Sequence, residues 1–323
     1  MSKGNKSTGK LVFSILFLVL CVGGFYCVIS GFNPFDMQQI EEIVEPEKEC
    51  LSDYSFEDLS EISKNVAKMK NQDDINNYLR ENFLLDIAYQ PTKELINVET
   101  KDGRELTFRF IGYNDDVDSD GNVVGLTFMC AKPCCMRCMN EDGSTEGSWK
   151  DSDLRAYLND EFIKLLPEDF SSQIKTVVKT TNNANCKVNS LGDTSTTEDK
   201  LWLLSASEVC GQIKWYSSEQ TYGSIHNTSI DDLMNKEGSQ YEYFKVNGVT
   251  DKSDTHNVLL MKYADQGCAW WYRSPHAYEF NPNSVSEYNA DKESYFYSVM
   301  SSGFPFSWSA PETNQGVVFG FCI

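Results

Sequence analysis

The sequence predicts an α+β protein with small antiparallel sheets and long loops, preceded by an N-terminal transmembrane helix and a pair of helices. Three observations indicate this class. Residues 11–29 form an uncharged apolar run, and apolar residues then recur at helical spacing as far as Phe83. From Leu95 the period changes to two, and short apolar or aromatic blocks at 199–209, 268–275 and 316–323 are typical of buried strands.

Composition limits the classes of partner. The chain has 323 residues, of which 41% are hydrophobic and 13% aromatic, enough for a packed core. Its 28 basic and 48 acidic side chains give a formal charge of −20, which repels the phosphates of nucleic acids. We therefore expect no nucleic-acid partner.

The apolar run predicts a membrane anchor at residues 11–30. At about 1.5 Å per residue it spans roughly 28 Å, close to the thickness of a bilayer's hydrocarbon core. A cleaved signal peptide is the alternative, but the bulky Phe25 and Tyr26 suit a cleavage site poorly. Lys3, Lys6 and Lys10 precede the run and no acidic residue does, so we expect residues 1–10 to be a cytoplasmic tail. This predicts a single-pass protein of the cell membrane with an extracellular domain.

Next come an acidic linker at 31–50 and a helical pair at 51–93. Pro34, Pro46 and a string of glutamates leave the linker little to bury. Ser55 followed by Asp58 resembles a capping box at the start of the first helix. The pair is either a stalk that binds a partner or two helices that pack on the main domain.

The main domain is expected to cover residues 94–323. A hairpin with Asp102-Gly103 at its turn should join strands at 95–98 and 106–111, and a strand at 123–129 should follow. An amphipathic helix is expected at 151–166 and a further strand at 174–179. The polar segments 180–198 and 221–265 read as surface loops.

Several blocks resemble a bacterial family of exported or membrane-anchored domains of unknown function. They are L-R-A-Y-L-N at 154–159, D-K-L-W-L-L-S at 199–205, W-W-Y-R-S-P at 270–275 and G-V-V-F-G-F-C-I at 316–323. The resemblance implies a C-type-lectin-like fold, similar to that of formylglycine-generating enzymes. The chain departs from the family at Tyr272, where a Leu is usual, and at Val318 and Phe319, which replace an Arg-Pro pair.

One short motif points to metal. Asp116, Asp118 and Asp120 alternate ahead of Gly121, as at the start of a calcium loop. Position twelve is Thr127 rather than Glu, and strands are expected on both sides, so a true EF-hand is excluded. A looser calcium site or an acidic, solvated turn remains, and we expect no other cofactor.

The cysteines admit three interpretations. Two of the eleven, Cys21 and Cys27, lie in the predicted membrane segment. The crowded set Cys130, Cys134, Cys135 and Cys138 could form a disulfide, begin a zinc site, or pack as reduced thiols.

Two sets of residues bear on function. Trp270, Trp271 and Arg273 could stack on a sugar, but neighbouring strand residues face opposite sides, which favours core packing. Copper-dependent oxidase chemistry, as the resemblance implies, would need Cys268 and Cys322 together. No phosphate loop or catalytic triad is present in the sequence. We therefore expect an extracellular binding module for a glycan or protein, with an oxidase-like enzyme or a structural surface protein as alternatives.

Overall fold

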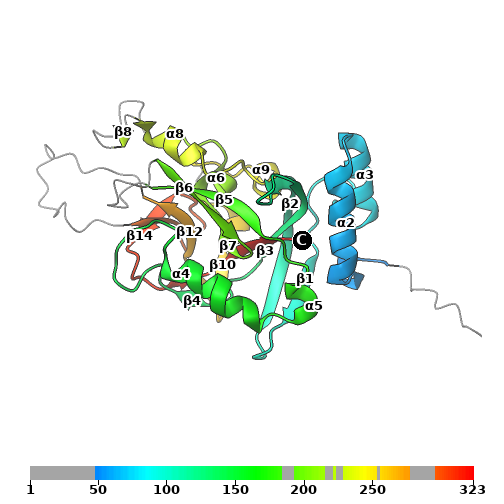
Figure 1. The fold of residues 1–323 in the computed structure, drawn as a ribbon, viewed down its shortest axis with the longest axis horizontal. Helices are drawn as coiled ribbons and strands as arrows, with labels where there is room; N and C mark the ends of the chain where they lie inside the picture. Colours follow the sequence, from blue (N-terminus) through cyan, green and yellow to red (C-terminus); the bar gives the residue numbers. More distant parts are fainter. Residues whose placement is uncertain (1–47, 184–192, 215–220, 223–227, 253–254, 277–294) are drawn as a thin grey trace, which may run out of the picture. The chain divides into compact units, whose positions relative to one another are not determined.

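The C-terminal strand lies inside a five-stranded antiparallel sheet in the computed structural model (Figure 1). The sheet has the order β1 (Leu95–Glu99), β2 (Glu105–Val117), β3 (Val123–Cys130), β16 (Phe319–Cys322) and β7 (Trp202–Leu203). Leu95 pairs with Arg109 and Glu99 with Glu105, so the hairpin predicted around Asp102-Gly103 is confirmed. The structure describes residues 48–183, 193–214, 221–222, 228–252, 255–276 and 295–323.

A second five-stranded sheet holds the aromatic block. Its order is β14 (Ser307–Ser309), β13 (Phe296–Val299), β12 (Trp270–Pro275), β15 (Gln315–Gly316) and β4 (Met136–Arg137). β12 and β15 are parallel, whereas the other neighbours are antiparallel. Three hairpins complete the described strands: β5 (Val177–Asn182) with β6 (Thr194–Asp199), β8 (Thr221–Tyr222) with β9 (Thr228–Ser229), and β10 (Met261–Tyr263) with β11 (Gln266–Cys268). The α+β class with small antiparallel sheets is confirmed.

Of the helical pair, the first helix packs on β3 and the second contacts the first helix and β2. α2 (Phe56–Lys68) begins at a capping box formed by Ser55 and Asp58, as predicted, and α3 (Gln72–Glu81) follows it. Ser63 of α2 accepts a hydrogen bond from the Leu126 backbone N–H at 3.1 Å and donates one to the carbonyl of Ile323. Residues 48–323, which include both helices, form one compact unit. Of the two interpretations of the pair, the structure therefore shows helices packed on the main domain (Figure 1).

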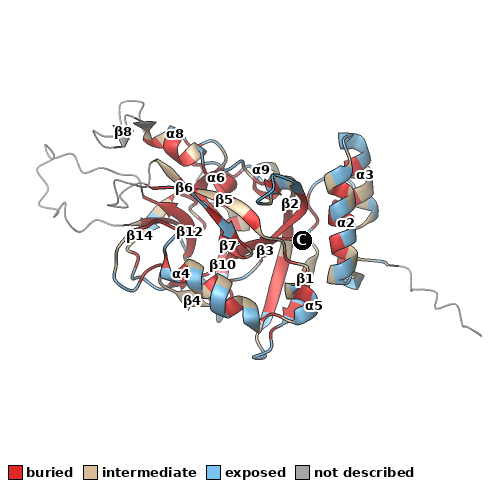
Figure 2. Cartoon of the chain, in the orientation of Figure 1, coloured by how far each residue is buried: buried red, intermediate tan, exposed pale blue. Residues whose placement is uncertain are grey.

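The strands β3 and β7, which flank the terminal strand, are mostly buried (Figure 2). Aromatic rings pack in the core here. Phe321 stacks on Phe128 with ring centroids 5.5 Å apart and meets Phe108 and Phe170 edge to face. Phe321 is fully buried, as is Ile323. The chain end is thus part of the core.

The helix expected at 151–166 is helical but not uniform. It consists of α4 (Asp153–Ala156), a π turn (Tyr157–Glu161) and a 3-10 turn (Phe162–Leu165). Within the π turn, Asn159 donates a hydrogen bond to the carbonyl of Leu201 at 2.8 Å and accepts one from its N–H at 3.2 Å. α5 (Glu168–Ser171) follows.

Two loop predictions are wrong in part. β5 and β6 pair as far as Asn182 and Thr194, so residues 180–182 and 194–198 are strand and not loop. Segment 221–265 contains α8 (Ile230–Asn235) and α9 (Glu242–Val246), with Leu233, Tyr241 and Phe244 buried. Its Asn- and Ser-rich average composition hid these short apolar stretches. The block at 199–209 is also not one strand, because Ser205 and Glu208 form a capping box that starts α6 (Ala206–Cys210) after β7.

Residues 1–47, which include the predicted tail, the anchor and most of the linker, lie outside the described residues. In the part of the chain that is described, no helix has the length and apolar character needed to cross a membrane.

Candidate functional site

Five buried polar side chains meet between the two large sheets and are called the ionic cluster here: Asp116, Lys179, Glu208, Tyr241 and Arg273. None of them exposes more than 6% of its surface. The Lys179 ammonium contacts Asp116 and donates hydrogen bonds to Glu208 at 2.9 Å and to the Tyr241 hydroxyl at 2.8 Å. Buried charges persist in proteins when they are paired in this way.

Each member of the ionic cluster comes from a different element. Asp116 lies near the end of β2, after two irregularities of register opposite β3 that re-aim its side chain. Lys179 lies on β5, Glu208 on α6 and Arg273 on β12, while Tyr241 caps the start of α9. The cluster therefore ties together segments that are far apart in sequence.

Arg273 joins the ionic cluster to the surrounding backbone. Its guanidinium makes a bidentate ion pair with Glu208 at 2.5 and 3.0 Å. It also donates to the backbone carbonyls of Leu203, Thr180 and Glu237. Arg273 is fully buried, so the prediction of core packing is confirmed for this residue.

The pairing sets the charges of Glu208 and Lys179. Burial opposes the charge of Glu208, but Arg273 and Lys179 outweigh it and lower its pKa to about 2. Burial likewise opposes the charge of Lys179, yet the carboxylates of Asp116 and Glu208 raise its pKa above the ordinary value. Lys179 and Glu208 are consequently charged at neutral pH.

Glu237 lies beside the ionic cluster, but its pKa is raised whereas that of Glu208 is lowered. It is 2% exposed, and its carboxyl accepts hydrogen bonds from the Asn182 backbone and side chain and from the Ser274 hydroxyl. Burial raises its pKa to about 7, because the lowering effect of Arg273 and these hydrogen bonds is smaller. Glu237 therefore changes its charge near neutral pH.

A pocket of about 140 Å³ adjoins the ionic cluster. Asp116, Lys179, Glu208 and Tyr241 line it together with the exposed Asp115, Lys236, Gly238 and Ser239. At Gly238, whose φ is +150°, an added Cβ would lie 2.9 Å from Cγ of Glu208. Glycine at this position thus lets the 236–241 segment approach Glu208 closely.

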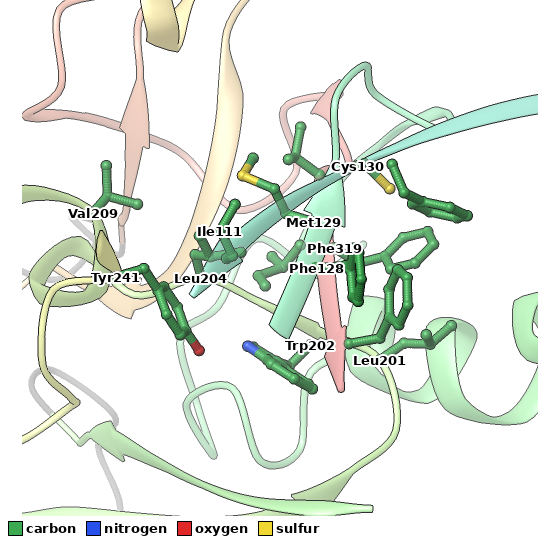
Figure 3. Close-up of a cluster of buried hydrophobic side chains, with 14 of the residues drawn as sticks. Ile111, Phe128, Met129, Cys130, Leu201, Trp202, Leu204, Val209, Tyr241 and Phe319 are labelled. Atoms are coloured by element: carbon green, nitrogen blue, oxygen red, sulfur yellow. The ribbon is translucent and has the colours of Figure 1, made fainter. Parts of the chain in front are cut away.

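Apolar rings surround the other side of the ionic cluster. The Lys179 ammonium lies 4.2 Å from the ring centroid of Trp202, a cation–π contact. Figure 3 shows Trp202 and Tyr241 among the buried apolar side chains, with the Tyr241 hydroxyl on the side of Trp202. On this side the ammonium of Lys179 is therefore shielded from bulk water.

The structure separates the three aspartates of the calcium-like motif. Asp116 contacts Lys179 in the ionic cluster. Asp118 accepts hydrogen bonds from the N–H groups of Asp120 and Asn122 at 3.0 and 2.8 Å in the turn between β2 and β3. Among the residues described, no group of three His, Cys, Asp or Glu side chains is placed to hold a metal ion.

Sequence reasoning paired Cys268 with Cys322, but the structure places them in different surroundings. Cys322 contacts Thr127 and Asp116 at 3.3 and 3.4 Å, whereas Cys268 pairs with Met261 in the β10–β11 hairpin. Burial raises the pKa of both thiols. In the cluster that begins at Cys130, the Cys134 thiol donates a hydrogen bond to the sulfur of Cys135 at 3.8 Å, and the two form no disulfide.

The two tryptophans of the aromatic block are core residues. Both Trp270 and Trp271 are fully buried. Their indole N–H groups donate to the carbonyls of Leu259 and Arg137 at 3.0 and 2.9 Å. The core-packing interpretation is confirmed, so these rings do not form a sugar platform.

The fold and site define an α+β domain with a buried ionic cluster beside a small polar pocket. A family model described as a domain of unknown function, DUF6273, matches residues 127–301, more than half of the chain. The chain belongs to this family. No curated protein and no solved structure matches it.

Sequence reasoning did not single out Lys179, Glu208, Glu237 or Tyr241. One sequence feature could have pointed to Glu208: it is the charged residue of a capping box within the largely apolar block 199–209. The family match covers these four residues and Arg273, while Asp116 and Cys322 lie outside it.

Proposed function

We propose that the protein is a membrane-anchored extracellular binding module of the C-type-lectin-like kind, whose pocket receives a polar group of a glycan or protein. One observation carries the proposal. The pocket is lined by residues of both polar segments of the main domain, Thr180 of segment 180–198 and Lys236 and Ser239 of segment 221–265. The predicted anchor at 11–29 supports display outside the cell.

The lining favours binding through hydrogen bonds. Asp115, Lys236 and Ser239 are exposed at the pocket and offer a carboxyl group, an ammonium that also pairs with Asp193 at 3.0 Å, and a hydroxyl. At about 140 Å³ the pocket is smaller than the roughly 300 Å³ at which sites for whole drug-sized ligands begin. A pocket of this size can hold a few hydroxyl groups of one sugar ring, or one polar side chain of a protein partner.

The copper-oxidase alternative has weaker support. Such chemistry needs accessible thiolates, whereas Cys322 is fully buried and burial raises the pKa of both Cys268 and Cys322. Thiol labelling of the native protein should leave both unmodified. Copper-dependent oxygen consumption that is lost in Cys268→Ser would establish the enzyme instead.

A rim substitution tests the binding proposal. Ser239→Trp should fill the pocket mouth without touching the core, because Ser239 is exposed. We expect the full-length chain to bind members of a glycan array or an immobilised protein panel, and Ser239→Trp to lose that binding at least tenfold, about 1.4 kcal/mol. Ser119→Trp, in the exposed β2–β3 turn, is the matched control. Equal binding by both variants would show that the pocket is not the binding site. No binding by the wild type would favour a structural surface protein.

A further inference from the structure

Lys179 and Asp116 are positioned for more than an ion pair. The Lys179 Nζ contacts Oδ1 of Asp116, and their side chains are only 3% and 6% exposed. A second carboxylate, Glu208, lies 2.9 Å from the same Nζ and is 4% exposed. An amine, a carboxyl and a separate proton acceptor are thus held together away from bulk water.

The other oxygen of Asp116 is surrounded by donors. Oδ2 accepts hydrogen bonds from the hydroxyls of Thr127 and Tyr241 at 2.9 and 3.1 Å, and from the Cys322 thiol at 3.4 Å. The Tyr241 hydroxyl also lies 3.3 Å from Oδ1, slightly farther than from Oδ2. Donors aimed at one carboxyl oxygen stabilise the negative charge that this oxygen carries when a nucleophile attacks the carbon. The arrangement leaves Oδ1, on the Lys179 side, as the oxygen that can depart.

We propose that Lys179 and Asp116 condense after folding into an intramolecular amide, an isopeptide bond that joins β5 to β2. The reactants are a side-chain ammonium and a side-chain carboxylate, and the products are one amide and one water molecule. No oxidant, metal or co-substrate is needed.

The step balances as follows. A proton passes from Nζ to Oδ1 across the contact, which gives a neutral amine and a carboxylic acid and so removes two charges from a buried site. Nζ attacks Cγ, and the developing oxyanion at Oδ2 is held by Thr127 and Tyr241. Glu208 takes the second proton from Nζ and returns it to the departing oxygen. The Cγ–Oδ1 bond breaks, the N–Cγ bond remains, and one water leaves.

Two further features of the structure suit this chemistry. The pocket of about 140 Å³ is lined by both Asp116 and Lys179, so the released water has room beside the bond that breaks. Fixed geometry favours the reaction, since groups held in contact react as one molecule and not by chance encounter. Arg273 keeps Glu208 ionised and in place as the proton acceptor.

Mass spectrometry of the full-length chain tests the proposal directly. The denatured protein should be lighter than its sequence by the mass of one water molecule. Trypsin should fail to cleave after Lys179, and a branched peptide should join the segment containing Asp116 to the segment containing Lys179. A full sequence mass together with cleavage after Lys179 would overturn the proposal and leave an ion pair only.

Variants test whether the mass loss comes from this amide bond or from dehydration elsewhere in the chain. Lys179→Arg and Asp116→Ala should each restore the full mass, because neither can form this amide. Glu208→Gln, which removes the proton acceptor at similar size, should restore most of it. Lys262→Arg, at an exposed residue, is the matched control and should keep the loss. A mass loss that survives Lys179→Arg would place the dehydration elsewhere and refute this bond, whether or not the variants are stable, since mass is read on denatured chains.

Discussion

At the scale of single residues, the buried carboxyl of Glu237 makes the free energy of unfolding depend on pH. Its pKa is raised to about 7 by burial, against an ordinary value of 4.5. The folded state therefore keeps this proton where the unfolded chain releases it. The unfolding free energy should decrease as pH rises from about 4.5 to about 7, by on the order of 3 kcal/mol for this group, and then stay level.

Glu237→Gln should remove that decrease, because an amide keeps a similar shape and does not ionise. Relative to wild type, the variant should gain stability as pH rises through this window. Urea unfolding at pH 4.5, 6 and 8 would measure the difference. The same substitution at the exposed Glu61 serves as control. A wild-type-to-variant difference that does not change with pH would contradict the buried, titrating carboxyl.

The individual site residues could be predicted from sequence only in part. Arg273 was expected in the core because it lies within an aromatic block. Asp116 was grouped with Asp118 and Asp120 by local spacing, but its partner is Lys179, 63 residues away. A sequence pattern of a few residues carries no information about such distant pairing.

At the scale of elements, Gly125 controls how closely α2 approaches β3. A Cβ at this position would lie 2.1 Å from the Ser63 backbone carbonyl oxygen, so the helix would have to move. Gly125→Ala should therefore destabilise the fold by about 1–3 kcal/mol in urea unfolding. Gly267→Ala is the control, since its nearest atom would be 3.7 Å away. Equal stability of the two variants would show that α2 does not pack tightly here.

The terminal strand is a second element with a testable role. β16 lies between β3 and β7, so deletion of residues 320–323 breaks the first sheet in its interior. It also removes Phe321 and Ile323, worth roughly 2–3 kcal/mol each, from a stability that is typically about 5–15 kcal/mol. Thermal unfolding followed by circular dichroism should lose its cooperative transition. An unchanged melting curve would contradict the buried terminus.

Elements with a strong local pattern could be predicted, whereas their arrangement could not. The hairpin at Asp102-Gly103 and helix α2 follow from turn chemistry and capping within a few residues. The position of β16 beside β3 and β7 depends on contacts between residues more than one hundred positions apart. α8 and α9 were missed because each is short and lies in a polar stretch, where tertiary packing stabilises the helix more than propensity does.

At the scale of the whole molecule, the sequence predicts topology. The uncharged run at 11–29 is long enough to span a bilayer core, and the lysines on its N-terminal side predict that this end stays in the cytoplasm. Protease added to intact cells should digest the acidic domain and leave a small membrane fragment that carries an N-terminal epitope tag. A cytoplasmic marker protein should survive the same treatment, and lysed cells should lose the marker as well. Recovery of the undigested chain in the soluble fraction of intact, protease-treated cells would refute an anchored extracellular domain, and with it the display on which the binding proposal depends.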